Sequence, residues 1–240
     1  MSRHTLNYWK QPLAEVPAEV WATSRLEALV LADCGLTSVP PAIGRLGDLR
    51  MLDLGHNAIA ELPDAIGDLA GLTDFLYVHD NRLTRLPDAI ARLTRLQYLN
   101  AGDNQLAALP EEIGAMAGLV ELRLERNALT ALPASIGRAA DLRELHATSN
   151  RLDALPEAIG DLAALRTLGL RDNRLRRLPA SMARLSRLLS LDLRGNPLED
   201  WPSELADLPA LEKLDLRWIP LPPAPPWVGD LRARGCLVYA

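Results

Sequence analysis

Leucine recurs at regular intervals along almost the whole chain, in the pattern LxxLxLxxNxL. Within each copy the closely spaced leucines alternate with polar residues, which is typical of a half-buried β-strand. The asparagine position is occupied by Asn57, Asn81, Asn104, Asn127, Asn150, Asn173 and Asn196. Its spacing is 23 residues except for one interval of 24, so one residue is inserted between Leu72 and Leu76. A fixed period of this length indicates a repeat architecture.

The pattern weakens towards both ends of the sequence. Gln11 and Cys34 occupy the asparagine position in the first two units, Ile219 occupies it in the last, and Leu237 and Tyr239 start a further half-unit. Terminal units of a solenoid are atypical because they cover the core. We therefore predict a single solenoid over residues 1–240, with an N-terminal capping repeat at 1–24, regular repeats at 25–210 and a C-terminal capping repeat at 211–240.

Each unit predicts one strand, one turn and one short helical segment. Leu122 and Leu124 point into the core while Glu121 and Arg123 point outward, because successive side chains of a strand alternate faces. The stacked asparagine amides have both donors and an acceptor, so they can form a ladder that satisfies backbone groups of the turns. The second half of the unit reads LPxxIGxL, and proline is tolerated in the first turn of a helix. A short helix or 3-10 segment on the convex side follows.

The complete 23-residue unit, LxxLPxxIGxLxxLxxLxLxxNxL, resembles the leucine-rich repeats of Ras-suppressor and Shoc2-like scaffolds, of plant intracellular Ras-group-related proteins and of similar bacterial proteins. The resemblance covers nearly the whole sequence. It implies an α/β fold, a leucine-rich repeat solenoid shaped as a curved horseshoe, with a concave parallel sheet and short helices or 3-10 turns on the convex side. The unit count predicts about eleven strands. As to function, the resemblance implies a protein-interaction scaffold.

Composition and charge narrow the classes of function. The chain is 48% hydrophobic and 24% charged, and its formal charge of -5 argues against a nucleic-acid partner. No apolar run approaches a membrane span and the first residues have no apolar signal segment, so we expect a cytoplasmic protein, with export lacking a cleavable signal as the alternative. Lys10 and Lys213 are the only lysines among 26 basic residues, which suggests a GC-rich bacterial genome.

The outward-facing positions form columns, because the same offset from each asparagine occupies the same place on successive strands. One stretch of these columns is apolar and aromatic, at Met51, Phe75, Tyr77 and Tyr98. Exposed aromatic side chains are typical of binding hot spots, and stacking on one another across strands is the alternative. We predict a concave partner-binding surface formed by Met51, Phe75, Tyr77, His79, Tyr98, Arg123 and His146.

Arginines occupy one column on three consecutive C-terminal strands, at Arg171, Arg194 and Arg217. They are candidates for binding an acidic ligand. Asp192 and Asp215 lie two residues before the last two arginines, so an interstrand arginine–aspartate lattice is the alternative, and we favour it. We expect Trp9 and Trp218, at the two ends of the concave side, to pack against the caps.

Another column places His56 between Asp33 and Asp80. A pH-sensitive rim is the interpretation we favour for this column. A metal site there, with His79 as a further ligand, is the alternative, but no HxH or HExxH spacing supports it. We therefore predict no metal and no cofactor.

The sequence predicts no enzyme, because it has no phosphate-binding glycine loop, GxSxG motif or zinc-type cysteine pair. Glu144 and Glu125 are within reach of His146, but no nucleophile aligns with it. We predict a recognition scaffold with a protein partner, no membrane partner and a monomeric state. The alternatives are a structural or regulatory module that dimerises through its edge strands, and a bacterial effector that acts on a host protein.

Overall fold

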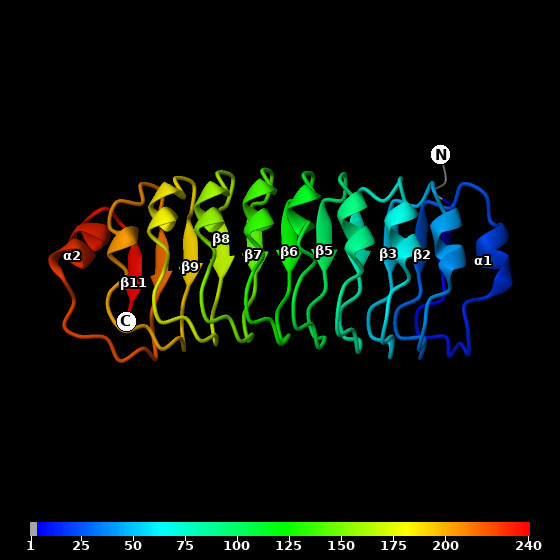
Figure 1. Cartoon of the computed structure of the whole chain (residues 1–240), viewed down its shortest axis with the longest axis horizontal. Coiled ribbons are helices and arrows are strands. Elements are labelled where there is room, and N and C mark those ends of the chain that lie inside the picture. Colours follow the sequence, from blue (N-terminus) through cyan, green and yellow to red (C-terminus); the bar gives the residue numbers. More distant parts are fainter. Residues whose placement is uncertain (1–3) are drawn as a thin grey trace.

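Residues 4–240 of the computed structural model form one open solenoid, in which successive coils stack side by side (Figure 1). Its eleven strands pair in parallel and in sequence order from β1 to β11. The strands are β1 (Thr5–Asn7), β2 (Ala28–Val30), β3 (Met51–Asp53), β4 (Phe75–Tyr77), β5 (Tyr98–Asn100), β6 (Glu121–Arg123), β7 (Glu144–His146), β8 (Thr167–Gly169), β9 (Ser190–Asp192), β10 (Lys213–Asp215) and β11 (Leu237–Tyr239). The first three residues of the expected N-terminal capping repeat lie outside the described residues.

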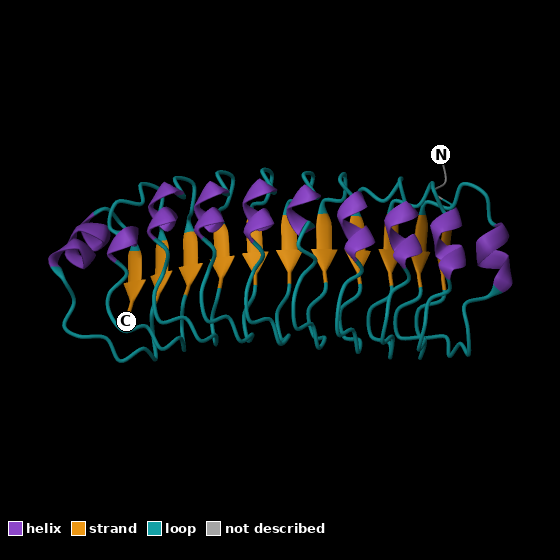
Figure 2. Ribbon diagram, in the orientation of Figure 1, coloured by secondary structure: helices purple, strands orange, loops and turns teal. Residues whose placement is uncertain are grey.

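Short helices cover one face of this sheet, and the opposite face is left to the outward side chains of the strands (Figure 2). We call that second face the concave face. Most of the short helices are 3-10 segments, as the LPxxIGxL half-unit predicts: η1 (Pro41–Arg45), η2 (Asp64–Asp68), η3 (Asp88–Arg92), η4 (Ile113–Ala115), η5 (Ala134–Arg138), η6 (Glu157–Asp161), η7 (Ala180–Arg184) and η8 (Ser203–Leu205). The α-helices are α1 (Ala18–Ala22) and α2 (Pro226–Ala233), and no helix within residues 4–240 has the length and apolarity to cross a bilayer.

The leucines of the repeat form one continuous core between the sheet and the 3-10 segments. Leu122 and Leu124 are fully buried, whereas Glu121 and Arg123 of the same strand are partly exposed. The pairing register joins equivalent positions of neighbouring strands, so Glu121 lies beside Glu144 and Arg123 beside His146. The columns predicted from the sequence are therefore columns in the structure.

The asparagine ladder is formed as predicted. The Nδ2 of Asn104 donates to the carbonyl of Val78 in the preceding coil and to those of Ala101 and Gly102 in its own, while its Oδ1 accepts the Leu83 amide at 2.9 Å. Cys34 takes the equivalent place near the N-terminal end, where its Sγ donates to the Tyr8 carbonyl at 3.1 Å. Each amide thus links two coils through backbone groups of the turns.

The inserted residue of the long unit is accommodated just before β4. In regular units the backbone amide two residues before the strand centre donates to the equivalent residue of the preceding coil, as Val120 does to the carbonyl of Gln97. The Gln97 amide instead donates to the carbonyl of Thr73, one residue earlier than the equivalent Asp74. The normal register holds within the strand, with Phe75 paired to Met51 and to Tyr98.

The proline-rich segment after Ile219 leads into helix α2, which covers the last coils. The indole of Trp201 donates to the carbonyl of Pro222 at 2.8 Å and meets the Trp227 ring edge to face, with centroids 6.0 Å apart. Leu231 of the helix is buried in the core. The segment therefore contacts the last coils through Pro222, Trp227 and Leu231.

Candidate functional site

Four aromatic rings of strands β4 and β5 and the turn after β4 contact one another on the concave face. The ring centroids of Phe75 and Tyr77 lie 5.8 Å apart, those of Phe75 and Tyr98 5.6 Å, and those of Tyr77 and Tyr98 5.2 Å. His79 meets Tyr77 edge to face at 5.9 Å. We call Phe75, Tyr77, His79 and Tyr98 the aromatic cluster. These separations are typical of favourable aromatic pairs, so cross-strand stacking is present.

The aromatic cluster is only partly accessible to water. Phe75 has 41% of its surface exposed, while Tyr77, Tyr98 and the adjoining Met51 are half-buried. Burial raises the pKa of both tyrosines, with the charge of Asp53 adding to the effect on Tyr77 and the charge of Arg123 opposing it on Tyr98. Both hydroxyls therefore stay protonated at neutral pH and can act as hydrogen-bond donors. The rings shield one another, so the outward-facing positions expose only part of each ring.

A pair of imidazoles extends the row of rings beyond the aromatic cluster. The Nε2 atoms of His56 and His79 lie 3.2 Å apart, and the rings are nearly perpendicular with centroids 4.7 Å apart. His56 Nδ1 lies 2.6 Å from Asp80 Oδ2, to which it donates. Burial, and then the neighbouring His56, lower the pKa of His79. Of the two acids expected beside His56, Asp80 is within hydrogen-bond distance of its ring, and Asp33 lines the same hollow.

Charged side chains replace the aromatic ones on strands β6 and β7. Arg123 Nε donates to Glu121 Oε1 at 2.6 Å, and Arg123 also lies 3.6 Å from Glu125. His146 Nε2 lies 3.1 Å from Glu144 Oε2. Pairing within each strand offsets the repulsion that Glu121 and Glu144 would otherwise experience side by side. The predicted site residues Arg123 and His146 therefore lie beyond the aromatic cluster, in a separate group of ion pairs.

The arginine column does not form the interstrand lattice that we favoured from the sequence. Arg194 donates through Nε and Nη2 to both carboxylate oxygens of Asp192 on its own strand, and Arg217 pairs with Asp215 in the same manner. A single contact crosses between these strands, from Arg194 to Asp215 at 3.5 Å. Because each arginine follows its aspartate by two residues, two of its guanidinium nitrogens can donate to the two carboxylate oxygens of that aspartate. Since each guanidinium has a carboxylate partner, the acidic-ligand hypothesis is weakened.

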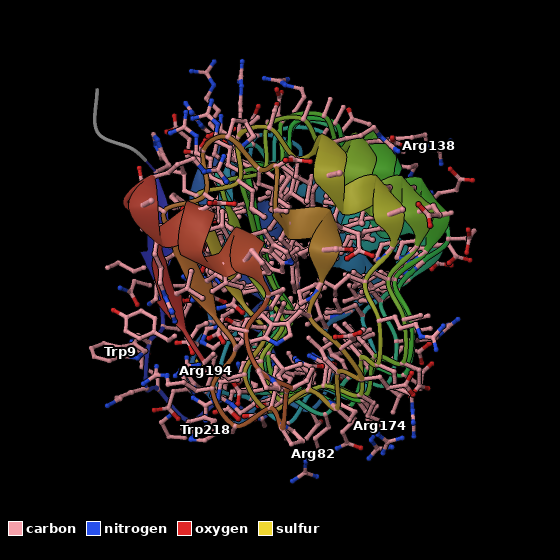
Figure 3. All side chains as sticks on the ribbon, turned by 90° about the vertical axis from the view of Figure 1, so that its left-hand side faces the viewer. Trp9, Arg82, Arg138, Arg174, Arg194 and Trp218 are labelled. Carbon is pink, nitrogen blue, oxygen red and sulfur yellow. The ribbon has the colours of Figure 1, made fainter. Side chains whose placement is uncertain are left out.

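The prediction that the end tryptophans pack against the caps is wrong for both. Trp218 is 65% exposed, and the guanidinium carbons of Arg171, Arg194 and Arg217 lie 5.0, 5.6 and 5.9 Å from its ring centroid. Trp9 is 57% exposed, with the Lys10 ammonium 4.8 Å from its ring. Figure 3 shows both tryptophans on the strand side with Arg194, whereas Arg138 lies on the helical side. Cation–π contact with the basic column accounts for the position of Trp218.

From the sequence we assigned His56 to a pH-sensitive rim and Trp218 to a cap. In the structure His56 contacts His79 of the aromatic cluster, and Trp218 contacts the three arginines of the basic column. Both residues lie directly before the ladder position, where the backbone has positive φ, 55° and 65°. Most units share this backbone conformation, so no signal in the sequence distinguished these two residues.

Neither cysteine has the environment of a nucleophile. Burial raises the pKa of the Cys34 thiol, with backbone hydrogen bonding near Gln11 opposing the shift, and burial also raises that of Cys236. A raised pKa leaves little thiolate at neutral pH. The His146 ring lies within hydrogen-bond distance of the Glu144 carboxylate.

Comparison with known proteins finds the same architecture elsewhere. A family model described as a leucine-rich repeat region matches residues 135–233. A solved leucine-rich repeat protein of Leptospira interrogans superimposes with a TM-score of 0.75 and 28% identity, over 98% of this chain and 71% of that chain. No curated protein sequence matches.

Two plant receptors are also similar in structure. The leucine-rich repeat ectodomain of the receptor kinase GASSHO1/SCHENGEN3 from Arabidopsis thaliana, solved with CASPARIAN STRIP INTEGRITY FACTOR 2, has a TM-score of 0.80 and 30% identity over 90% of this chain. The plant peptide hormone receptor RGFR1, solved with RGF2, has a TM-score of 0.78 and 34% identity over 86% of this chain. This chain spans only 27% and 34% of those two receptor chains.

Proposed function

Since this chain is a leucine-rich repeat protein, we propose that it is a non-catalytic recognition module that binds a protein partner on its concave face, centred on the aromatic cluster. The observation that carries the proposal is the row of contacting rings across β4 and β5. Rings that already contact one another lose little conformational entropy on binding. Less of the free energy gained by burying them is therefore offset by that loss than for mobile side chains. Phe75, the most exposed ring of the cluster, would be buried against the partner, and the neighbouring tyrosine hydroxyls would donate hydrogen bonds to it.

The surroundings of the aromatic cluster suit a hot spot. Binding hot spots combine a few aromatic anchors with a polar margin that excludes water. Here Glu121 and Arg123 adjoin the cluster on β6, and Asp80 and His56 adjoin it at the sheet edge. The two plant receptors support a peptide or protein as the kind of ligand, because one was solved in complex with CASPARIAN STRIP INTEGRITY FACTOR 2 and the other with RGF2.

We also propose a cytoplasmic monomer that acts without a cofactor. Measurement of the solution mass over a range of concentrations tests the monomeric state. A mass that rises with concentration would favour assembly through the edge strands, where Leu237 of β11 is 58% exposed.

The proposal is tested by affinity capture from the source cell with three forms of the protein. These are the wild type, the double variant Tyr77→Ala/Tyr98→Ala, and a control double variant, Arg171→Ala/Arg194→Ala, at the other end of the concave face. Truncation of two hot-spot residues removes about 2 kcal/mol or more, so the tyrosine variant should bind its partner at least about 30-fold more weakly. The arginine variant should bind normally.

The reverse result would move the site to the C-terminal half and restore the acidic-ligand hypothesis. A partner retained by both variants would place recognition on the convex face or the edges. Thermal melts of all three forms separate lost binding from lost folding, because the tyrosines are half-buried and contribute less to stability than a core leucine.

A further inference from the structure

We propose that His56 and His79 together form a binding site for a zinc ion at the edge of the concave sheet. The two residues lie at different offsets in consecutive units, so no linear motif joins them. The fold brings their Nε2 atoms to 3.2 Å from each other. This site does not depend on the proposed protein-binding function.

The separation of the two nitrogens suits tetrahedral coordination. Zinc binds imidazole nitrogen at about 2.0–2.1 Å. Two nitrogens 3.2 Å apart at that bond length subtend an angle of roughly 100–106° at the metal. This is close to the tetrahedral angle, and the exposed His56 ring can turn towards the ion because 53% of its side chain is accessible.

The surroundings of His56 match those of a metal-ligating histidine. Its Nδ1 donates to the Asp80 carboxylate at 2.6 Å, so its Nε2 lone pair accepts the Nε2–H of His79, and a zinc ion would replace that proton. A carboxylate that accepts from the far nitrogen is the usual partner of a zinc-bound histidine, because it orients the ring and raises its basicity. On the other ring, His79 Nδ1 is buried and has no hydrogen-bond partner within residues 4–240. His79 would carry its proton on this Nδ1 when zinc is bound, so His56 is the better-prepared ligand of the two.

The surface next to His56 is hollow and carries more acidic than basic side chains. A hollow of about 480 Å³ adjoins His56, lined by Trp9, Lys10, Asp33, His56, Asn57 and Asp80. Its two carboxylates outnumber its single ammonium, and that ammonium lies against the Trp9 ring. Water would occupy the two remaining positions, one more than in zinc sites with three protein ligands.

Another group of potential ligands lies on strands β6 and β7, where donor atoms of Glu121, Glu144 and His146 approach one another. Within that group the Glu121 carboxylate already accepts a hydrogen bond from Arg123 Nε at 2.6 Å. A cation entering there would have to displace a charge-assisted hydrogen bond and approach a fixed positive charge. At the imidazole pair an ion would displace only the hydrogen bond between the two Nε2 atoms and no arginine, so we assign the zinc site to His56 and His79, and His146 provides a matched control.

The test is titration of the full chain with Zn²⁺ by calorimetry at pH 7.5, with Co²⁺ absorption as a spectroscopic measure of coordination. We expect one ion per chain and at least tenfold weaker binding in His56→Ala and in His79→Ala. Asp80→Asn should weaken binding about tenfold, as loss of an orienting carboxylate does. The controls His4→Ala and His146→Ala should bind within twofold of the wild type.

Absence of stoichiometric binding to the wild type would overturn the proposal. So would unchanged affinity in both pair variants, which would indicate adventitious binding, or a loss confined to His146→Ala, which would place the ion on β6 and β7. If a pair variant folds poorly, the imidazole ¹⁵N signals of the wild type decide the question. Zinc must shift the Nε2 signals of His56 and His79 and leave that of His146 in place.

Discussion

Replacing Asn104 with alanine should destabilise the solenoid by about 1–3 kcal/mol, and the structure identifies the single group responsible. The three carbonyls that accept from its Nδ2 all keep another donor. The carbonyl of Val78 keeps Asn81 Nδ2 at 3.2 Å, that of Ala101 keeps Asn127 Nδ2 at 3.0 Å, and that of Gly102 keeps the Asp80 amide at 3.0 Å.

The Leu83 amide, by contrast, donates to Asn104 Oδ1 and lies on a residue with no exposed surface. Alanine leaves this N–H buried and unpaired, and the free-energy cost of such a group is the full desolvation penalty of a lost hydrogen bond. Nearly all of the expected destabilisation therefore arises at one backbone position in the preceding coil.

Urea denaturation followed by circular dichroism measures the change in free energy of unfolding, and native-state hydrogen exchange measures the protection of the Leu83 amide. Gln105→Ala is the matched control, because that side chain is exposed and its replacement should change stability by less than about 0.5 kcal/mol. A loss as small as that of the control, or undiminished protection at Leu83, would refute the role given to the ladder.

Two further substitutions test close packing and charge. Gly114→Ala should cost about 1–3 kcal/mol in urea melts, because its Cβ would overlap the Ser135 carbonyl oxygen of the next coil, while Gly47→Ala, with open space around it, should be neutral. Asp215→Asn should cost about 1–3 kcal/mol at pH 7. Burial opposes ionisation of Asp215, but hydrogen bonds from Arg217 hold its pKa below the usual range, so its contribution is present at neutral pH and lost as the pH falls through that pKa. A deficit that persists unchanged well below pH 4 would contradict this assignment.

The sequence alone determined the period, the strand positions, the direction of every core leucine and the amide ladder. The physical reason is that each unit repeats the same few constraints. A strand alternates its faces, a buried amide must meet backbone groups, and 23 residues allow a single short return path. Residues at equivalent positions of successive units lie side by side in the sheet. The strand of one coil therefore predicts the strands of the other coils, and with them the columns of the concave face.

Only the tertiary structure decided which neighbour each long or ring-shaped side chain contacts. The position of a residue within the repeat predicts where its Cβ atom lies. From that Cβ atom an arginine or tryptophan side chain can reach several neighbouring residues, and the contacts differ little in free energy. Arg194 pairs with Asp192 on its own strand rather than across strands, and Trp218 lies over the arginines instead of on a cap. The facing imidazoles of His56 and His79 likewise depend on the turns after two different strands, whose backbone geometry no column predicts.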